Sequence, residues 1–275
     1  MDPHDADLVL LDRPATGITV LTLNRPERMN SMSFDVMVPL RDALADIHRD
    51  NECRVLVLTG AGRGFCSGAD QSGEKGRLPG VGGLTQPTVA LRAMELLDEV
   101  VLALRGLHQP VVAAVNGAAI GGGLCLALAC DIRVASHAAY FRAAGINNGL
   151  TASELGLSYL LPRAVGSSRA AEIMLTGRDV HADEAERIGL VSEVVEPLDL
   201  LPAAIEIGRR IGAWSRPGVE LTKRTLWAGL DAGSLAGHMQ AEGLGQLYVR
   251  LLTGNFEEAV EARKEGRPPV FRDER

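Results

Sequence analysis

The chain has 275 residues, of which 46% are hydrophobic and 23% charged, so it is long enough for one large globular domain with a sizeable core. A formal net charge of −7, with no basic run, excludes an electrostatic surface for nucleic acid. The acidic start MDPHDAD lacks the basic region of a signal peptide, and the four cysteines contain no CxxC pair. We therefore expect a cytoplasmic protein with reduced thiols.

The first third of the chain predicts two strands, a helix and a long loop. β-Branched residues in ITVLTLN (18–24) predict a strand that ends before Pro26. Apolar residues at helical spacing predict a helix over 33–48, with Ser33 as N-cap and Pro39 as a kink or a sign of a later start. The segment RVLVLTG (54–60) predicts a short buried strand. The glycine-rich segment 60–83 is too long for a simple connection and predicts a functional loop.

The middle of the chain continues the alternation of helices and strands. We expect a helix over 88–105, a strand over 110–117, a helix over 122–130 and a strand over 132–136. The uncharged stretch 111–130 is long enough to cross a bilayer. However, Asn116 and a cluster of glycines interrupt it and no aromatic belt flanks it, so a buried strand, turn and helix explain it better.

The pattern changes after residue 165. Helices are predicted over 167–175 and 182–188, a strand over 191–196, and amphipathic helices over most of 198–265. No linker separates the two parts. The order of elements predicts an α/β core over 1–197 and a helical C-terminal region over 198–275.

Several common site motifs are absent or incomplete. Gly60-Ala-Gly62 follows a strand, but Phe65 stands where a dinucleotide fingerprint has its third glycine. The chain has no GxxxxGK[ST] phosphate loop and no GxSxG elbow. Its six histidines lack metal-ligand spacing, so we expect no metal site.

Two glycine-rich junctions remain as candidate sites: FCSGAD (65–70) and NGAAIGGGL (116–124). Glycine lets a ligand approach the main chain closely, and the second junction opens a predicted helix. Free N–H groups and the positive dipole at a helix start suit a developing oxyanion. The alternative is that both junctions are tight turns packed against their neighbours.

Ordered motifs along nearly the whole chain resemble the enoyl-CoA hydratase/isomerase (crotonase) superfamily. They are ITVLTLNRPERMNSM, RVLVLTGAGRGFCSGAD, QPVVAAVNGAAIGGGLCLALACDIRVAS, AYFRAAGINNGL, SYLLPRAVGSSRAAEIMLTGRDVHADEAERIGLVSEVV and GRPPVF. The resemblance implies a spiral α/β core of ββα repeats and a helical C-terminal trimerisation region, in a homotrimer or a hexamer built as a dimer of trimers. It implies an acyl-CoA thioester as substrate, with no cofactor beyond the substrate's CoA and no membrane partner.

The resemblance also implies site residues. The thioester oxygen would accept hydrogen bonds from the N–H groups of Ala69 and Gly122. The substrate- and CoA-binding candidates are Arg25, Met29, Ser67, Ala69, Asp70, Gln71, Gly121, Gly122, Cys125 and Gly145. For Arg25 a solvated surface charge is the alternative. Ser72 stands where many relatives carry a lysine toward the CoA phosphates, and Lys75 or Arg77 could take that role.

Departures from the family pattern concern the acids. Hydratases of this family use two glutamates, and this chain has Cys125 and Gly145 at those positions. Glu154, eight residues before Pro162, resembles the acid of family members that move double bonds. Its apolar surroundings would raise its pKa, as proton transfer near neutral pH requires. The alternative is an acid in the first turn of a helix capped by Thr151 or Ser153.

Other residues have lesser roles in this interpretation. Cys125 is either a thiol nucleophile toward the thioester or a packing residue. Asp70 is expected to hold the loop that presents Ala69, and Asp131 to order the turn after its helix. Asn147 and Asn148 contact the acyl group or form a turn.

Three functions stay open on the sequence. The first is double-bond isomerisation by Glu154 through an enolate, in fatty-acid or related acyl-CoA metabolism. The second is hydrolysis of an acyl-CoA thioester, and the third is acyl-CoA binding without catalysis.

Overall fold

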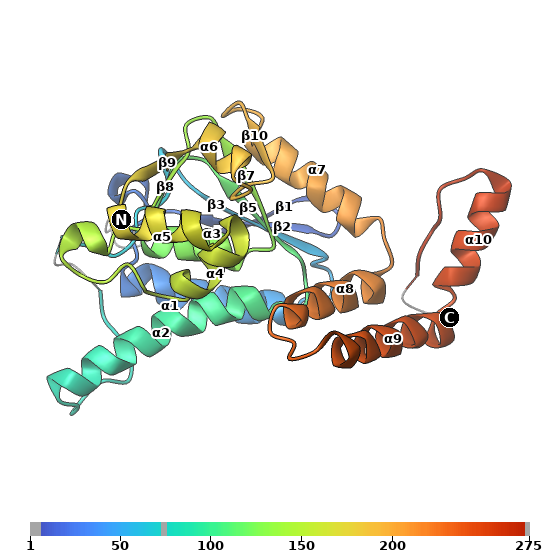
Figure 1. The fold of residues 1–275 in the computed structure, drawn as a ribbon, viewed down its shortest axis with the longest axis horizontal. Coiled ribbons are helices and arrows are strands. Elements are labelled where there is room, and N and C mark those ends of the chain that lie inside the picture. The colour runs from blue at the N-terminus through green and yellow to red at the C-terminus, as the bar shows by residue number, and fades with distance from the viewer. Residues whose placement is uncertain (1–6, 73–75, 273–275) are drawn as a thin grey trace.

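The computed structural model describes residues 7–72 and 76–272 and confirms the predicted α/β class. Two β-sheets occupy the centre of the molecule, with helices around them, and the last helices extend to one side (Figure 1). Within the described residues, no helix is both long and apolar enough to cross a membrane. The stretch 111–130 instead forms a strand and a helix, as expected, with a second, short strand in place of the predicted turn.

The larger sheet has six strands. In spatial order they are β1 (Val9–Ala15), β2 (Ile18–Leu23), β3 (Val55–Gly60), β5 (Val111–Val115), β7 (Ile132–Ser136) and β10 (Glu193–Val195). β1 runs antiparallel to β2, and the other neighbouring pairs are parallel. The inner strands are apolar along their whole length because both faces of the sheet are covered.

The smaller sheet positions the two glycine-rich junctions. Its strands, in spatial order, are β4 (Gly64–Cys66), β6 (Ala118–Ile120), β8 (Tyr140–Arg142) and β9 (Asp179–His181). β4 therefore interrupts the single long loop expected over 60–83. Because β4 and β6 are parallel neighbours, the segments that follow them leave the sheet at the same edge.

Helices cover both faces of the larger sheet. The main core packs the inner faces of the sheets against α1 (Phe34–Arg49), α2 (Gln86–Gly106), α3 (Gly122–Ala129) and α4 (Leu157–Val165). A second core lies on the other face, under α7 (Leu200–Gly212). Two shorter helices, α5 (Ser167–Thr176) and α6 (Ala182–Arg187), follow α4 in the chain. The α/β part of the chain also contains two single-turn 3₁₀ helices, η1 (Pro26–Arg28) and η2 (Ile146–Asn148).

The helix predicted over 33–48 is α1, but the two local signals read from its sequence, the N-cap Ser33 and the helix breaker Pro39, do not act as expected. Ser33 takes the N-cap position, but its buried hydroxyl has no hydrogen-bond partner among the described residues. Pro39 lies inside α1 on its exposed side, where the helix continues past it. The apolar face of α1, rather than its cap, therefore fixes this helix.

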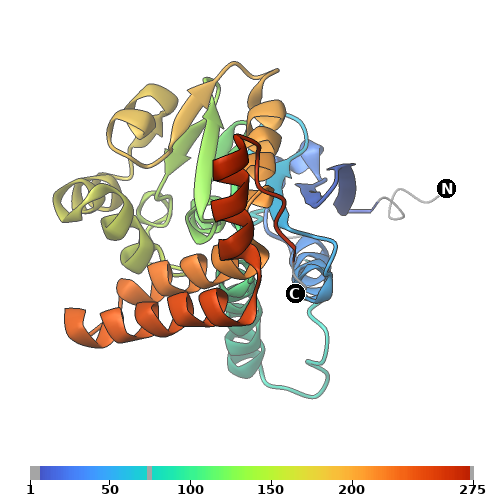
Figure 2. The same ribbon diagram turned by 90° about the vertical axis from the view of Figure 1, so that its right-hand side faces the viewer.

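The C-terminal helices project from the core. They are α8 (Arg216–Gly229), α9 (Leu235–Leu252) and α10 (Asn255–Glu265). Figures 1 and 2 both show α9 alongside α8 and away from the sheets. No residue of α9 is buried within the described chain. Buried Lys223 of α8 fastens this region to the core through an ion pair with Asp131, at 2.8 Å between Nζ and Oδ2.

Candidate functional site

The two glycine-rich junctions lie against each other at the edge of the smaller sheet. Gly68, between β4 and the segment 69–72, has a φ of +80°, which glycine adopts readily. A Cβ added to Gly68 would lie 2.6 Å from the Ile120 carbonyl oxygen and 3.4 Å from the Gly122 nitrogen. The turn that carries Ala69 therefore packs directly on the start of α3.

The backbone of Ala69 pairs on one side only. It forms an isolated parallel bridge with Met32, in which the Met32 N–H donates to Gly68 (2.7 Å) and the Asp70 N–H donates to Met32 (3.4 Å). These bonds leave the Ala69 N–H outside the pairing. Ala69 is exposed, whereas Gly68 and Asp70 are buried. Ala69, the predicted donor, is thus accessible between two buried neighbours.

Each of the three glycines at the start of α3 has its own steric reason. Gly121 has a φ of +53°. A Cβ on Gly122 would lie 2.2 Å from the Met32 sulfur, and a Cβ on Gly123 would lie 1.9 Å from the Cys66 carbonyl oxygen. Gly122 is the first residue of α3, so its N–H has no partner within the helix. The Gly122 nitrogen lies next to Gly68, the residue before Ala69, so the two predicted donor residues lie at the same edge of the smaller sheet.

Glu154 lies beside this glycine turn. One of its carboxylate oxygens is 3.1 Å from the position of a Cβ on Gly121. Glu154 precedes α4, whose N-cap is Gly156, so the alternative of an acid in the first turn of a helix is not what the structure shows. Within residues 7–72 and 76–272 its carboxylate has no hydrogen-bond donor or cation, and burial raises its pKa.

The two residues at the hydratase acid positions are both buried. Cys125 is fully buried, and its thiol donates to the Glu154 carbonyl, with 3.5 Å between sulfur and oxygen. Desolvation, and then the charge of Glu154, raise the pKa of this thiol, which argues against a nucleophile. Gly145 lies under the 151–152 backbone, where a Cβ would be 1.9 Å from the Thr151 carbonyl oxygen.

Asp70 anchors the segment that presents Ala69. Its carboxylate accepts from Arg25 Nη1 at 2.5 Å, from the Ser31 hydroxyl and from the Ser72 N–H and hydroxyl. Desolvation alone would raise the pKa of Asp70, but the hydrogen bonds from Ser72 and the Arg25 guanidinium hold it well below its usual range. Arg25 is thus engaged in a buried ion pair, in contrast to a freely solvated charge.

The other predicted contacts lie around this core. Met29 is half-buried with a φ of +53°, and it accepts at its carbonyl from the Ser67 N–H at 3.0 Å. Gln71 and Arg77 are exposed, as are Asn147 and Asn148 in η2. Lys75 lies outside the described residues.

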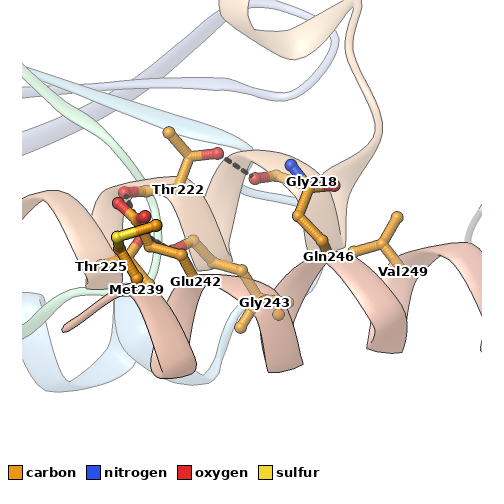
Figure 3. Close-up of a pocket in the computed structure, with 10 residues that line it drawn as sticks. Gly218, Thr222, Thr225, Met239, Glu242, Gly243, Gln246 and Val249 are labelled. Carbon is orange, nitrogen blue, oxygen red and sulfur yellow. Dashed lines mark hydrogen bonds between the residues drawn. The ribbon is translucent and has the colours of Figure 1, made fainter. Parts of the chain in front are cut away.

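Two cavities lie elsewhere, beside α8. One of about 500 Å³ is lined by α8 and α9, and Figure 3 shows Thr222 and Glu242 on its walls. Another of about 550 Å³ is lined mainly by apolar side chains, including Trp214, Trp227 and Phe271. Neither is lined by Ala69, Gly122 or Glu154.

Sequence reasoning missed two neighbours of the site. Met32 contacts the position of a Cβ on Gly122, and Leu155, with a φ of +45°, contacts the same position from the other side. A leucine carries no sequence signal for a left-handed backbone, and the pairing of Met32 with Ala69 joins segments far apart in the chain.

Comparisons with known proteins show the family to which the chain belongs. The profile of the enoyl-CoA hydratase/isomerase family matches residues 13–274. The chain is 72% identical to the probable enoyl-CoA hydratase EchA12 of Mycobacterium tuberculosis, over 97% of this chain and 93% of that protein.

Two solved structures are similar as well. A probable enoyl-CoA hydratase/isomerase from Mycobacterium abscessus is 69% identical with a TM-score of 0.93, over 98% of this chain and 100% of that one. A monofunctional enoyl CoA isomerase from M. smegmatis is 64% identical with a TM-score of 0.72, over 85% of this chain and 98% of that one.

Proposed function

Because the chain belongs to the enoyl-CoA hydratase/isomerase family of acyl-CoA enzymes, we propose that it moves a carbon–carbon double bond within an acyl-CoA, with Glu154 as the only carboxylate that transfers protons. The observation that carries this proposal is the Glu154 carboxylate beside the Gly121–Gly122 turn, in a site whose two hydratase positions are Cys125 and Gly145. CoA belongs to the substrate, and the scheme needs no metal or other cofactor.

The N–H groups of Ala69 and Gly122 hold the thioester oxygen in this proposal. Both residues follow neighbouring strands of the smaller sheet, β4 and β6. The Gly122 N–H also lies at the positive end of the α3 dipole. When the substrate loses a proton next to the thioester, negative charge moves to this oxygen. One such donor stabilises the transition state by about 3 kcal/mol.

Proton transfer then needs one base. The Glu154 carboxylate takes a proton from C2 of a 3-enoyl-CoA, and the electron pair of that bond spreads over a dienolate. The protonated Glu154 returns the proton to C4, which leaves the double bond between C2 and C3. The raised pKa of Glu154 suits both halves of this cycle, because the group must accept and release a proton at similar pH.

Hydration fits this site less well. Adding water across the double bond in the family's manner requires two carboxylates, and Gly145 has no room for a side chain under the Thr151 carbonyl. Hydrolysis by a thiol nucleophile is disfavoured because Cys125 is fully buried. A 64% identical relative is described as a monofunctional enoyl CoA isomerase, which supports the proposal.

A substrate panel tests the proposal. Purified wild type and Glu154→Gln are given 2-enoyl-, 3-enoyl- and dienoyl-CoA, and Glu193→Gln, an exposed acid of β10, serves as the matched control. We expect double-bond migration by wild type and the control, and a loss of about a thousandfold in Glu154→Gln. Strong hydration of 2-enoyl-CoA that Glu154→Gln leaves unchanged would contradict the mechanism. Release of free CoA would indicate a hydrolase, and binding without turnover would indicate a non-catalytic protein.

A further inference from the structure

Cys125 connects the two halves of the candidate site. It lies in the first turn of α3, where its N–H donates to the Gly121 carbonyl at 3.1 Å. Its thiol donates to the Glu154 carbonyl, with 3.5 Å between sulfur and oxygen. One buried residue therefore touches both the glycine turn that opens α3 and the backbone of the acid.

The backbone of Glu154 needs such support. The two residues after it, Leu155 and Gly156, have φ values of +45° and +80°, and a left-handed backbone is unfavourable for leucine. Within the described chain, the Glu154 carbonyl accepts from two donors: the Cys125 thiol and the Leu157 N–H, the latter at 2.7 Å. Because no donor in the described chain holds the carboxylate itself, this backbone turn sets where the carboxylate points.

We propose that Cys125 is a positioning residue, whose thiol holds the Glu154 turn and so aims the Glu154 carboxylate at the Gly121–Gly122 turn. This inference rests on the proposed function only for its effect on turnover. A thiol suits the role because it donates a hydrogen bond without bringing a second charge near the acid. Burial raises the pKa of the Cys125 thiol and keeps the proton that it donates.

The chain offers a matched control at the opposite end of the same helix. Cys130 follows α3, is fully buried like Cys125, and its thiol also donates to a carbonyl, that of Leu126, at 3.3 Å. It differs in lying at the far end of α3 from Glu154. Replacing either cysteine by alanine removes a buried sulfur and one such hydrogen bond, so a general packing defect should affect both variants alike.

The experiment measures double-bond migration of a 3-enoyl-CoA by wild type, Cys125→Ala, Cys125→Ser and Cys130→Ala. Misplacing a catalytic group by a fraction of an ångström lowers turnover, so we expect kcat to fall about tenfold to about a hundredfold in Cys125→Ala with KM changed by less than about threefold. Cys125→Ser restores a donor and should recover most of that loss. Cys130→Ala should keep kcat near the wild-type value.

A second measurement does not depend on turnover. Amide hydrogen exchange of 154–157 should become faster in Cys125→Ala and stay as in wild type in Cys130→Ala. Equal effects of the two alanine variants on kcat, or unchanged exchange at 154–157 in Cys125→Ala, would overturn the inference. If wild type shows no Glu154-dependent migration, the proposed function fails, and the exchange comparison alone decides whether Cys125 holds the turn.

Discussion

At the scale of single residues, the site contrasts two carboxylates that lie on neighbouring segments. Asp70 is surrounded by donors, which keep it ionised, whereas the Glu154 carboxylate faces no donor in the described chain and is perturbed by burial alone. When the environments of two acids push their pKa values apart, the two acids can take different roles, one structural and one in proton transfer. The contacts of Asp70 fit its predicted role in holding the loop, and the unpaired carboxylate of Glu154 fits the proton transfer that we propose for it.

The raised pKa of Glu154 predicts a pH dependence. The group acts first as a base, so migration requires its ionised form, and the rate should rise with pH through a midpoint above the ordinary pKa of a glutamate. The measurement is kcat/KM for a 3-enoyl-CoA across the acid range. A midpoint at or below the ordinary glutamate pKa would contradict the burial argument.

Replacing Asp70 should lower the free energy of unfolding. Its side chain is 3% exposed and that of Arg25 is 12% exposed, so Asp70→Asn leaves the buried Arg25 with only the exposed Glu27, at 3.8 Å, and should cost about 3 kcal/mol in the free energy of unfolding. Because the pKa of Asp70 is lowered on folding, its contribution is present above the ordinary aspartate pKa and is lost as pH falls through the lowered value.

Denaturant unfolding at neutral and acid pH checks this prediction, with Asp46→Asn as the control. Asp46 pairs with Arg49 on the exposed face of α1, where an ion pair contributes less than about 1 kcal/mol. The difference between wild type and Asp70→Asn should be large at neutral pH and shrink in acid. A difference that grows as the pH falls would contradict the assignment.

At the scale of elements, most of the longer strands and helices were predictable, although β1 was missed, and the three-residue strands of the smaller sheet were not. Strands β2, β3 and β7 have continuous apolar or β-branched runs, and α2 shows helical spacing. β4 and β6 have three residues each, which is too short for a periodic signal, and they form only by pairing with each other and with β8. These two strands bring the glycine junctions together. The glycine clusters indicated both junctions in the sequence, and motif resemblance added Ala69, Gly122 and Glu154 as the candidate residues.

The start of α3 predicts two different outcomes for alanine. Gly123→Ala meets the rigid Cys66 carbonyl at 1.9 Å, so α3 must shift from β4 and the free energy of unfolding should fall by about 3 kcal/mol. Gly122→Ala meets the flexible end of the Met32 side chain, so it should lower the free energy of unfolding by less than Gly123→Ala does. Its kcat should still fall, because Gly122 is a proposed donor to the thioester oxygen. Thermal unfolding and kcat of both variants test this. Equal loss of stability in the two variants would contradict the steric account.

At the scale of the whole molecule, the C-terminal helices are joined to the core through α8 and expose an apolar face on α9. Asp131 accepts from Lys223, from the Trp227 indole and from the Val111 N–H, which ties α8 to the start of β5. The sequence indicated that Asp131 orders a turn, but its link to α8 spans a separation in the chain that no local pattern reveals. The three-dimensional structure was needed to find it.

The exposed face of α9 predicts self-association. Leu244, Leu247 and Leu251 lie at helical spacing and each is more than half exposed. Covering such a face would release water from apolar surface, so we expect self-association, for which the family resemblance implies a trimer or a dimer of trimers. Light scattering of wild type and Leu247→Glu checks this, with a lower mass expected for the variant. A wild-type monomer at micromolar concentration would contradict the prediction.

The central claim is that one carboxylate both removes and returns the proton, and isotope transfer tests it most directly. A 3-enoyl-CoA deuterated at C2 is incubated with the enzyme in ordinary water, and the product is analysed by mass spectrometry and NMR. The account predicts a 2-enoyl-CoA with part of the deuterium at C4, and no such product from Glu154→Gln. A 3-hydroxyacyl-CoA as the main product, formed equally by wild type and Glu154→Gln, would contradict it.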